Sequence, residues 1–131
     1  MKNILITGGA GFIGSHLVKR FVHNYPDYNI YNVDNLTYAG SLNNVKEIEN
    51  KKNYFFFKID INNHKKILKL FKEKNISDVI HLAAESHVDR SIESSFEFAK
   101  TNVLGTLSLL EACKKLWKLS SKKNIFYHIS T

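Results

Sequence analysis

The chain has 131 residues, a length at which one domain with a single hydrophobic core is expected. Apolar residues make up 44% of it, which is too many for a disordered chain, and no stretch approaches the roughly 18 consecutive apolar residues of a membrane span. The net charge is +7, but the basic residues are mostly scattered lysines, as on the wet face of a helix. We therefore expect a folded domain with neither a membrane nor a nucleic acid as partner.

A single cysteine, Cys113, excludes an internal disulfide, and its apolar helical surroundings predict a buried structural thiol. The sequence passes from Met1 directly into a strand pattern and carries no signal-peptide pattern. We therefore expect a reducing, cytoplasmic setting. No metal site is predicted.

Short runs typical of strands alternate with helical periodicity along the chain. Strands are predicted at residues 3–7, 30–34, 54–59, 79–82 and 125–129, and helices from near Gly11 to before Pro26, after Asn63 and over about 96–116. This alternation predicts an α/β fold, a Rossmann-type doubly wound parallel sheet, of which the five strands are the amino-terminal portion. Residues 1–131 then form one incomplete domain.

The first strand runs into a glycine-rich turn. Gly9, Gly11 and Gly14 fit the spacing G-x-G-x-x-G, and Gly8, Gly11 and Gly14 fit G-x-x-G-x-x-G. The early glycines permit a tight turn, Gly11 lets a pyrophosphate approach the backbone, and Gly14 lets the helix pack closely on the sheet. The helix that begins near Gly11 points free N–H groups at the phosphates. A tight turn without a ligand is the alternative.

The next two strands end in carboxylates. Asp34 follows the second strand, where a carboxylate accepts hydrogen bonds from both ribose hydroxyls and repels a 2′-phosphate, so NAD is favoured over NADP. A loop carboxylate or a helix cap is the alternative for Asp34. Asp60 follows the third strand, where it could border an adenine, cap the following helix, or do both.

Ionisable residues gather after the fourth strand, and an asparagine interrupts the long helix. Glu85, His87, Asp89 and Arg90 predict the mouth of a ligand site, with a wet loop of ion pairs as the alternative. Asn102 is a poor helix former, so we expect its side chain to bond to the neighbouring strand or to support the site. We expect two other histidines, His16 and His81, to be structural or partly exposed.

The sequence stops at the carboxyl end of its fifth strand, which is where ligands bind in open α/β sheets. A domain seldom ends there, so we expect a piece of a longer protein. The apolar edge beside residues 125–129 is then an aggregation hazard.

Four segments carry a family resemblance: the glycine loop, DNLTYAG at 34–40, LAAESHVDRS at 82–91 and TNVLGT at 101–106. The glycine loop resembles that of the extended short-chain dehydrogenase/reductase superfamily and would fit epimerases and reductases equally. Together, the segments closely resemble the dTDP-glucose 4,6-dehydratase family of nucleotide-sugar dehydratases over the whole chain. An NAD-dependent nucleotide-sugar epimerase is the alternative.

The resemblance implies a bound NAD, a nucleotide-sugar substrate (dTDP-glucose) and a homodimeric parent enzyme. Ser86, His87 and Thr131 would contact the substrate, with Thr131 in a supporting catalytic role. The implied cofactor-binding residues are Gly8, Gly11, Phe12, Ile13, Gly14, Asp34, Asn35, Leu36, Thr37, Asp60, Ile61, Leu82, Ala83, Ala84, Ser86 and Thr101.

The family's reaction resembles a closed redox cycle, with oxidation at sugar C4, loss of water across C5 and C6 and reduction at C6. Its base belongs to a Tyr-x-x-x-Lys pair. Tyr54 and Lys58 have this spacing but lie on a predicted strand, so we reject them. We expect the 131-residue chain alone to have no dehydratase activity. A non-catalytic NAD-binding remnant is the second interpretation.

Overall fold

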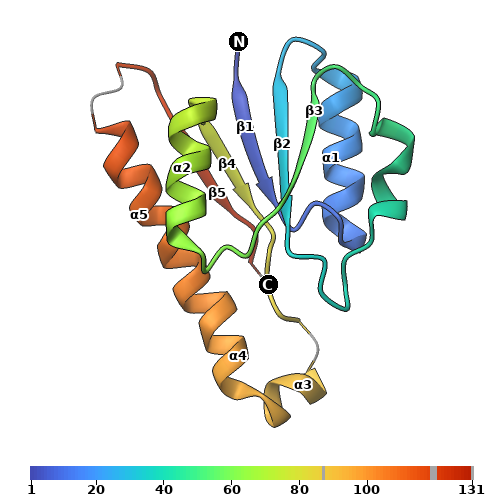
Figure 1. Ribbon diagram of the computed structural model, residues 1–131, viewed down its shortest axis with the longest axis vertical. Coiled ribbons are helices and arrows are strands. Elements are labelled where there is room, and N and C mark those ends of the chain that lie inside the picture. The colour runs from blue at the N-terminus through green and yellow to red at the C-terminus, as the bar shows by residue number, and fades with distance from the viewer. Residues whose placement is uncertain (87, 119–120, 131) are drawn as a thin grey trace.

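The computed structural model describes residues 1–86, 88–118 and 121–130 as five strands and the helices between them (Figure 1). The elements are, in order, β1 (Asn3–Thr7), α1 (Phe12–Asn24), β2 (Asn29–Asp34), the 3-10 segment η1 (Leu42–Ile48), β3 (Tyr54–Lys58), α2 (His64–Lys74), β4 (Asp78–His81), α3 (Val88–Glu93), α4 (Ser95–Ala99), the π-helical segment η2 (Lys100–Gly105), α5 (Thr106–Trp117) and β5 (Ile125–His128). Among the described residues, no helix has the length and apolar character needed to cross a membrane.

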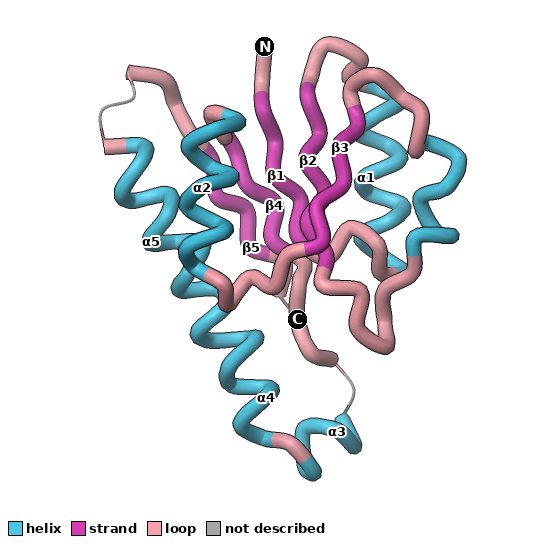
Figure 2. Tube along the Cα trace, in the orientation of Figure 1, coloured by secondary structure: helices cyan, strands magenta, loops and turns pink. Residues whose placement is uncertain are grey.

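The strands form one parallel sheet in the order β3-β2-β1-β4-β5. Helix α1 and η1 cover one face, and α2 and α5 cover the other (Figures 1 and 2). Parallel strands that are covered on both faces consist of nearly continuous apolar residues. This pattern allowed the strands to be predicted from the sequence. The predicted Rossmann-type sheet is confirmed, and each predicted strand end lies within one residue of the observed end.

Two hydrophobic clusters fill the two faces of the sheet. The cluster under α2 and α5 contains Leu5, Val33, Val79, Phe71 and Leu109, together with the thiol of Cys113. The cluster under α1 and η1 is built around Ile4, Ile6, Ile30, Val18 and Ile48. Alternate residues of β1 thus point to opposite faces, as the period of a strand requires.

The long apolar helix is present but is not one regular α-helix. It runs through α4, η2 and α5, from Ser95 to Trp117, and the middle part is π-helical. Within this part Gly105 is buried against Ile61, where an added β-carbon would lie 2.5 Å from the Ile61 Cδ1 atom. Single π turns inside helices are frequent at functional sites.

The start of α2 corrects one interpretation of Asp60. The helix cap is Asn63, whose side-chain oxygen accepts a hydrogen bond from the Lys66 N–H at 3.2 Å. The Asp60 carboxylate instead accepts the Asn62 N–H at 2.9 Å. The prediction that Asp60 caps this helix is therefore wrong, because the chain makes one further turn before the helix begins.

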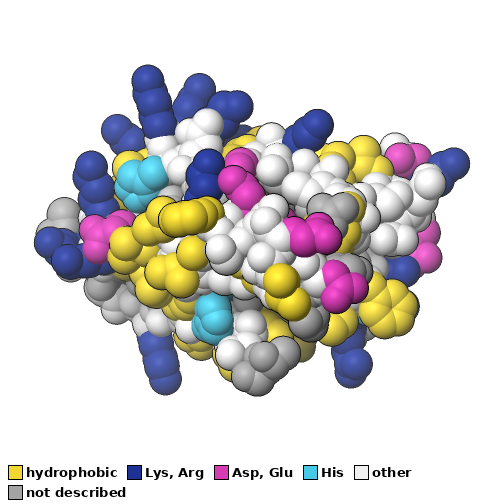
Figure 3. All heavy atoms as spheres, turned by 90° about the horizontal axis from the view of Figure 1, so that it is seen from below, with side chains coloured by type: hydrophobic (Ala, Val, Ile, Leu, Met, Phe, Trp, Pro, Cys, Tyr) yellow, Lys and Arg dark blue, Asp and Glu magenta, His cyan; other side chains and the backbone are white. Residues whose placement is uncertain are grey.

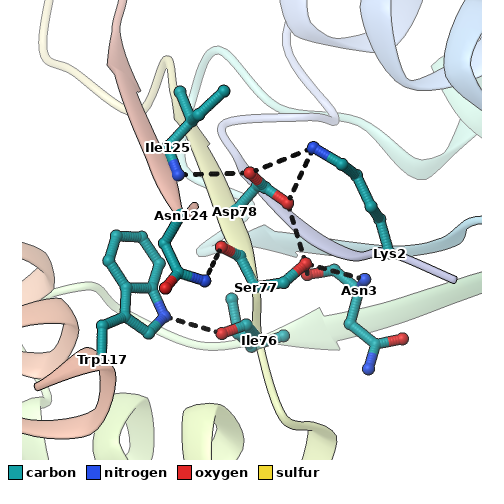
Figure 4. A network of polar contacts seen from close by, with 8 residues as sticks. All are labelled: Lys2, Asn3, Ile76, Ser77, Asp78, Trp117, Asn124 and Ile125. Carbon is teal, nitrogen blue, oxygen red and sulfur yellow. Dashed lines mark hydrogen bonds and ion pairs between the residues drawn. The ribbon is translucent and has the colours of Figure 1, made fainter. Parts of the chain in front are cut away.

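A polar network holds the amino-terminal ends of β1, β4 and β5 together (Figure 4). The Asp78 carboxylate is 6% exposed and accepts hydrogen bonds from the Ile125 N–H at 3.2 Å and the Ser77 hydroxyl at 2.8 Å. Lys2 contacts the same carboxylate at 3.4 Å. A cavity of about 620 Å³ adjoins this network, at the amino-terminal ends of the strands and so at the end of the sheet opposite the glycine loop.

Strand β5 forms one edge of the sheet and leaves apolar side chains uncovered. Ile125, Tyr127 and Ile129 are each at least 40% exposed. An unpaired apolar edge invites pairing with other chains. The predicted tendency to aggregate stays a prediction.

Candidate functional site

A cavity of about 490 Å³ lies at the carboxyl ends of the strands. Its walls come from the glycine loop, the loop after β2, the residues after β3, the loop after β4 and the helical segment around Thr101. Figure 3 looks onto this face, where hydrophobic and acidic side chains occupy the middle and most basic side chains lie around the rim. The middle of this face therefore carries few basic side chains.

The glycine loop makes a closed turn after β1. Gly8 has a φ of 74°, in the region that favours glycine, and its N–H donates to the Val33 carbonyl at 2.8 Å. A β-carbon on Gly8 would lie 2.8 Å from the backbone nitrogen of Ala83. Both the backbone angle and the close approach of the loop after β4 therefore require glycine here.

The other glycines of the loop have separate physical reasons. A β-carbon on Gly9 would overlap the side chain of Asn32, and one on Gly14 would overlap the Gly8 carbonyl oxygen. At Gly11 it would meet nothing closer than the Gly8 carbonyl oxygen, at 3.4 Å, among the described residues. Packing therefore requires Gly9 and Gly14, whereas Gly11 leaves bare backbone at the cavity.

Helix α1 begins directly at this loop, with Gly11 as its N-cap. Its first turn contains no acidic residue, so the N–H groups and the positive end of the helix dipole are not neutralised by a side chain of that turn. Phe12 and Ile13 are 81% and 67% exposed and line the cavity. An anion at this position is favoured by both the free donors and the dipole.

The carboxylate of Asp34 joins the glycine loop to the loop after β2. One oxygen accepts the Ala10 N–H at 3.0 Å, and the other accepts the Leu36 N–H at 2.8 Å. The Ala10 carbonyl in turn accepts hydrogen bonds from the Ser41 N–H at 3.1 Å and the Asn44 side chain at 2.9 Å. A carboxylate has about four acceptor sites, so Asp34 retains capacity for further hydroxyl donors.

Tyr54 is buried on β3 and is not a base, as predicted. Its hydroxyl accepts a hydrogen bond from the Asn32 side chain at 3.0 Å, and burial raises the pKa of this phenol. The single oxygen of the Asn32 amide is buried beneath Gly9 and has no hydrogen-bond partner among the described residues. The spacing of Tyr54 and Lys58 is therefore a coincidence of sequence.

Two side chains hold the backbone of the loop after β4. The Thr7 hydroxyl oxygen accepts the N–H groups of Leu82 and Ala83, both at 3.2 Å. The Asn102 amide accepts the Glu85 N–H at 2.8 Å and donates to the Glu85 carbonyl at 3.0 Å. The predicted role of Asn102 in supporting the site thus has a geometric basis, although its partner is the loop and not the strand itself.

His81, which is 2% exposed, lies between the hydroxyl groups of Thr7 and Thr106. Its Nδ1 atom lies 2.6 Å from the Thr7 hydroxyl, and its Nε2 atom lies 2.8 Å from the Thr106 hydroxyl. Burial, with a smaller contribution from His128, lowers the pKa of His81 from 6.5 to about 4. His81 is therefore neutral near pH 7. His16, in contrast, is exposed and packs edge-on against Phe12.

The structure brings almost all predicted cofactor residues to this one cavity. Leu36 is the exception, since only its backbone takes part, through Asp34. His87 and Thr131 lie outside the described residues. Sequence reasoning missed Glu97 and Lys100, which also line the cavity. The sequence signal that could have found them is their position on the predicted helix: Glu97 lies one turn before Thr101, and Lys100 is adjacent to it.

The strand order and the glycine loop define a Rossmann-type domain with its cavity at the carboxyl ends of the strands. The family model described as GDP-mannose 4,6 dehydratase matches residues 5–131. The chain therefore belongs to the GDP-mannose 4,6 dehydratase family.

Individual relatives agree with this family. The dTDP-glucose 4,6-dehydratase of Haemophilus influenzae is 44% identical over all of this chain and 40% of its own length. The structure of dTDP-glucose 4,6-dehydratase from Bacillus anthracis in complex with NAD is 41% identical, with a TM-score of 0.85 over all of this chain and 38% of that one. The UDP-glucose 4-epimerase of Thermotoga maritima is 38% identical, with a TM-score of 0.77 over 87% of this chain and 34% of that one. The chain thus spans about 40% of the length of the curated dehydratase it matches.

Proposed function

We propose that the cavity beside the glycine loop binds NAD, and that the chain supplies the cofactor half of a nucleotide-sugar 4,6-dehydratase. The observation that carries this proposal is the meeting of three features at one cavity: bare backbone at Gly11, the uncompensated start of α1, and the Asp34 carboxylate. The similar Bacillus anthracis dehydratase is described in complex with NAD.

The residues of the cavity fit this cofactor chemically. A pyrophosphate requires backbone without side chains and free N–H donors, which Gly11 and the first turn of α1 offer. A ribose offers two hydroxyl donors, and Asp34 retains acceptor capacity for them. The same carboxylate would repel the 2′-phosphate of NADP, and Asp34 is followed by Asn35 and Leu36 with no arginine.

The proposed assignments follow the walls of the cavity. Phe12 and Ile13 cover the pyrophosphate, residues 34–37 hold the adenosine ribose, with Leu36 acting only through its backbone contact to Asp34, and Asp60 with Ile61 flanks the adenine. Residues 82–86 and Thr101 line the path to the nicotinamide. When bound, NAD supplies a reversible two-electron acceptor, and the part played by these residues is to bind and orient it.

The proposed substrate is a nucleotide sugar, dTDP-glucose, with its 4-keto-6-deoxy derivative as product. Support comes from the whole-chain similarity to dTDP-glucose 4,6-dehydratases. Ser86, which lines the cavity, would contact the substrate together with His87 and Thr131. We infer that the acid and base groups lie outside residues 1–131, so that this chain alone does not turn over.

A conversion assay tests the proposed activity. We expect a protein that contains this chain and the remaining length of its relatives to convert dTDP-glucose to the 4-keto-6-deoxy product, and the 131-residue chain to give none. NAD should raise the Tm of either form, because a ligand that binds the folded state stabilises it. Turnover by the short chain, or a longer protein that is folded and inactive, would contradict the proposal.

An NAD-dependent nucleotide-sugar epimerase is the second candidate. It rests on the similarity to the Thermotoga maritima epimerase, which covers 87% of this chain, whereas the Haemophilus influenzae dehydratase matches all of it at higher identity. The dehydratase is therefore favoured. The two differ in product, since an epimerase returns the 4-epimer and retains the hydroxyl at C6.

We further infer that the parent protein is a homodimer that pairs through the α4–η2–α5 face. Phe96 is 89% exposed, and Val103, Leu107 and Leu110 are between 43% and 62% exposed. The last three have helical spacing, so they form an apolar stripe. A stripe of this kind on a monomer exposes hydrophobic surface that a second copy would bury.

We also propose a reducing, cytoplasmic location. The support is the single cysteine, Cys113, whose thiol is buried among apolar residues of α2 and α5. Burial raises the pKa of this thiol to about 12, so it stays protonated and unreactive.

A further inference from the structure

His81 lies at the centre of a chain of hydrogen bonds that leads from β1 to the π-helical segment. The Thr7 hydroxyl contacts one nitrogen of its ring, and the Thr106 hydroxyl contacts the other. Thr106 then donates to the Asn102 carbonyl at 2.9 Å, while the Asn102 side chain holds Glu85. The chain therefore links both anchors of the loop after β4.

One arrangement of donors and acceptors satisfies every contact of this hydrogen-bond chain. The Asn102 carbonyl accepts but cannot donate, so the single hydrogen of the Thr106 hydroxyl points to it. Thr106 can then only accept from His81, which places the imidazole hydrogen on Nε2. The Nδ1 atom is left as an acceptor for the Thr7 hydroxyl, whose oxygen already accepts two N–H groups.

A charged His81 would break this arrangement. An imidazolium donates through both nitrogens, and the Thr7 oxygen has no lone pair left for a third donor. The loop would then lose one of its two hydrogen bonds to the Thr7 hydroxyl, while the Leu82 N–H would keep its contact to the Thr7 backbone carbonyl at 3.1 Å. Burial also lowers the pKa of His81 to about 4. Desolvation and the hydrogen-bond arrangement therefore both favour the neutral ring.

We propose that His81, as the neutral Nε2–H tautomer, is a positioning residue that fixes the 82–86 wall of the cavity. It does so by keeping the Thr7 hydroxyl aimed at the ring, so that its oxygen stays available to Leu82 and Ala83. This inference rests on the proposed function in one respect, namely that the wall faces NAD. Residues 82–86 all line the cavity, and His81 itself does not.

Substitutions at Thr106 test the proposal without altering the cavity lining. Thr106→Val removes the hydroxyl and retains the shape, whereas Thr106→Ser retains the hydroxyl. Ser108→Ala is the matched control, because Ser108 is a buried hydroxyl on the same helix that bonds to His64 at 3.0 Å, away from the loop. All three are compared with the wild type in the full-length protein that contains this chain.

Amide hydrogen exchange gives the decisive reading and needs no ligand. In Thr106→Val we expect the Ala83 and Glu85 amides to exchange about tenfold faster, the effect of one lost buried hydrogen bond. Thr106→Ser and Ser108→Ala should match the wild type at these amides. Equal acceleration in Thr106→Val and Ser108→Ala would overturn the proposal, as would a ¹⁵N spectrum with the His81 proton on Nδ1.

Nucleotide titration separates this inference from the proposed function. In Thr106→Val we expect NAD to bind about tenfold more weakly, while ADP, which lacks the nicotinamide half, binds as before. Equal loss of both nucleotides would overturn the positioning role. If the folded wild type binds neither, the proposed NAD site is refuted, and the exchange comparison still decides whether His81 fixes the loop.

Discussion

Single residues of the glycine loop have different reasons for being glycine. Gly9 has no room for a β-carbon because the side chains of Asn32 on β2 and Val18 on α1 pack against it. Gly11 has room, but its open side belongs to the cavity. Two substitutions that look equivalent in the sequence should therefore fail in different ways.

We predict that Gly9→Ala lowers the free energy of unfolding by about 1–3 kcal/mol, the usual effect of overpacking. Gly11→Ala should change it by less than about 0.5 kcal/mol and should weaken NAD binding at least about tenfold. Urea unfolding and NAD titration of both variants check this. The same loss of stability in both would contradict the distinct roles of the two glycines.

The buried neutral His81 makes stability depend on pH. Its pKa is lowered on folding, so the unfolded state takes up the proton first as the pH falls. The stabilisation is complete above about pH 6.5 and is lost as the pH falls toward 4. We predict that this histidine accounts for about 3 kcal/mol over that window. His81→Gln should flatten the corresponding part of the unfolding profile, and an unchanged slope would refute the assignment.

At the scale of elements, the ends of helices were harder to predict than the strands. The start of α2 offered two good capping residues, Asp60 and Asn63, and only the turn of the backbone after β3 decides between them. The π-helical segment was not predicted, and two of its residues contact parts of the chain that are distant in the sequence. Asn102 bonds to Glu85, and Gly105 packs on Ile61.

We expect Asn63→Ala to cost about 1 kcal/mol of stability, since it removes the cap of α2. Asp60→Ala should cost about 0.5 kcal/mol or less, because it breaks an exposed contact to Asn62 only. Thermal unfolding of the two variants distinguishes them. If Asp60→Ala were the more damaging change, the cap would have been assigned to the wrong residue.

At the scale of the whole molecule, the fold and most of the cavity could be predicted from the sequence. Buried parallel strands are recognisable in a sequence as apolar runs. Because the carboxyl ends of parallel strands lie at the same end of the sheet, Asp34, Asp60 and Leu82 were expected to lie together. The contributions of Glu97 and Lys100 were missed because the long helix had to be placed against the sheet first. The packing of Asn32 under Gly9 is likewise a tertiary contact without a sequence signal.

The apolar stripe on α4, η2 and α5 carries a prediction about assembly. We expect Leu107→Glu to shift the protein from dimer to monomer in sedimentation experiments, because a buried charge without a partner is costly. Lys65→Glu, an exposed change on α2, is the control for added negative charge and should leave the dimer intact. A wild type that is monomeric at high concentration would count against the proposed interface.

The central claim is that one cavity, with bare backbone at a helix start and a carboxylate beside it, holds NAD. Calorimetric titration of the purified, folded protein with NAD and with NADP tests it most directly. We predict one NAD bound per chain, at least about tenfold more tightly than NADP, because Asp34 repels the extra phosphate. A folded sample that releases no heat with NAD, or that binds both nucleotides equally, would contradict the account.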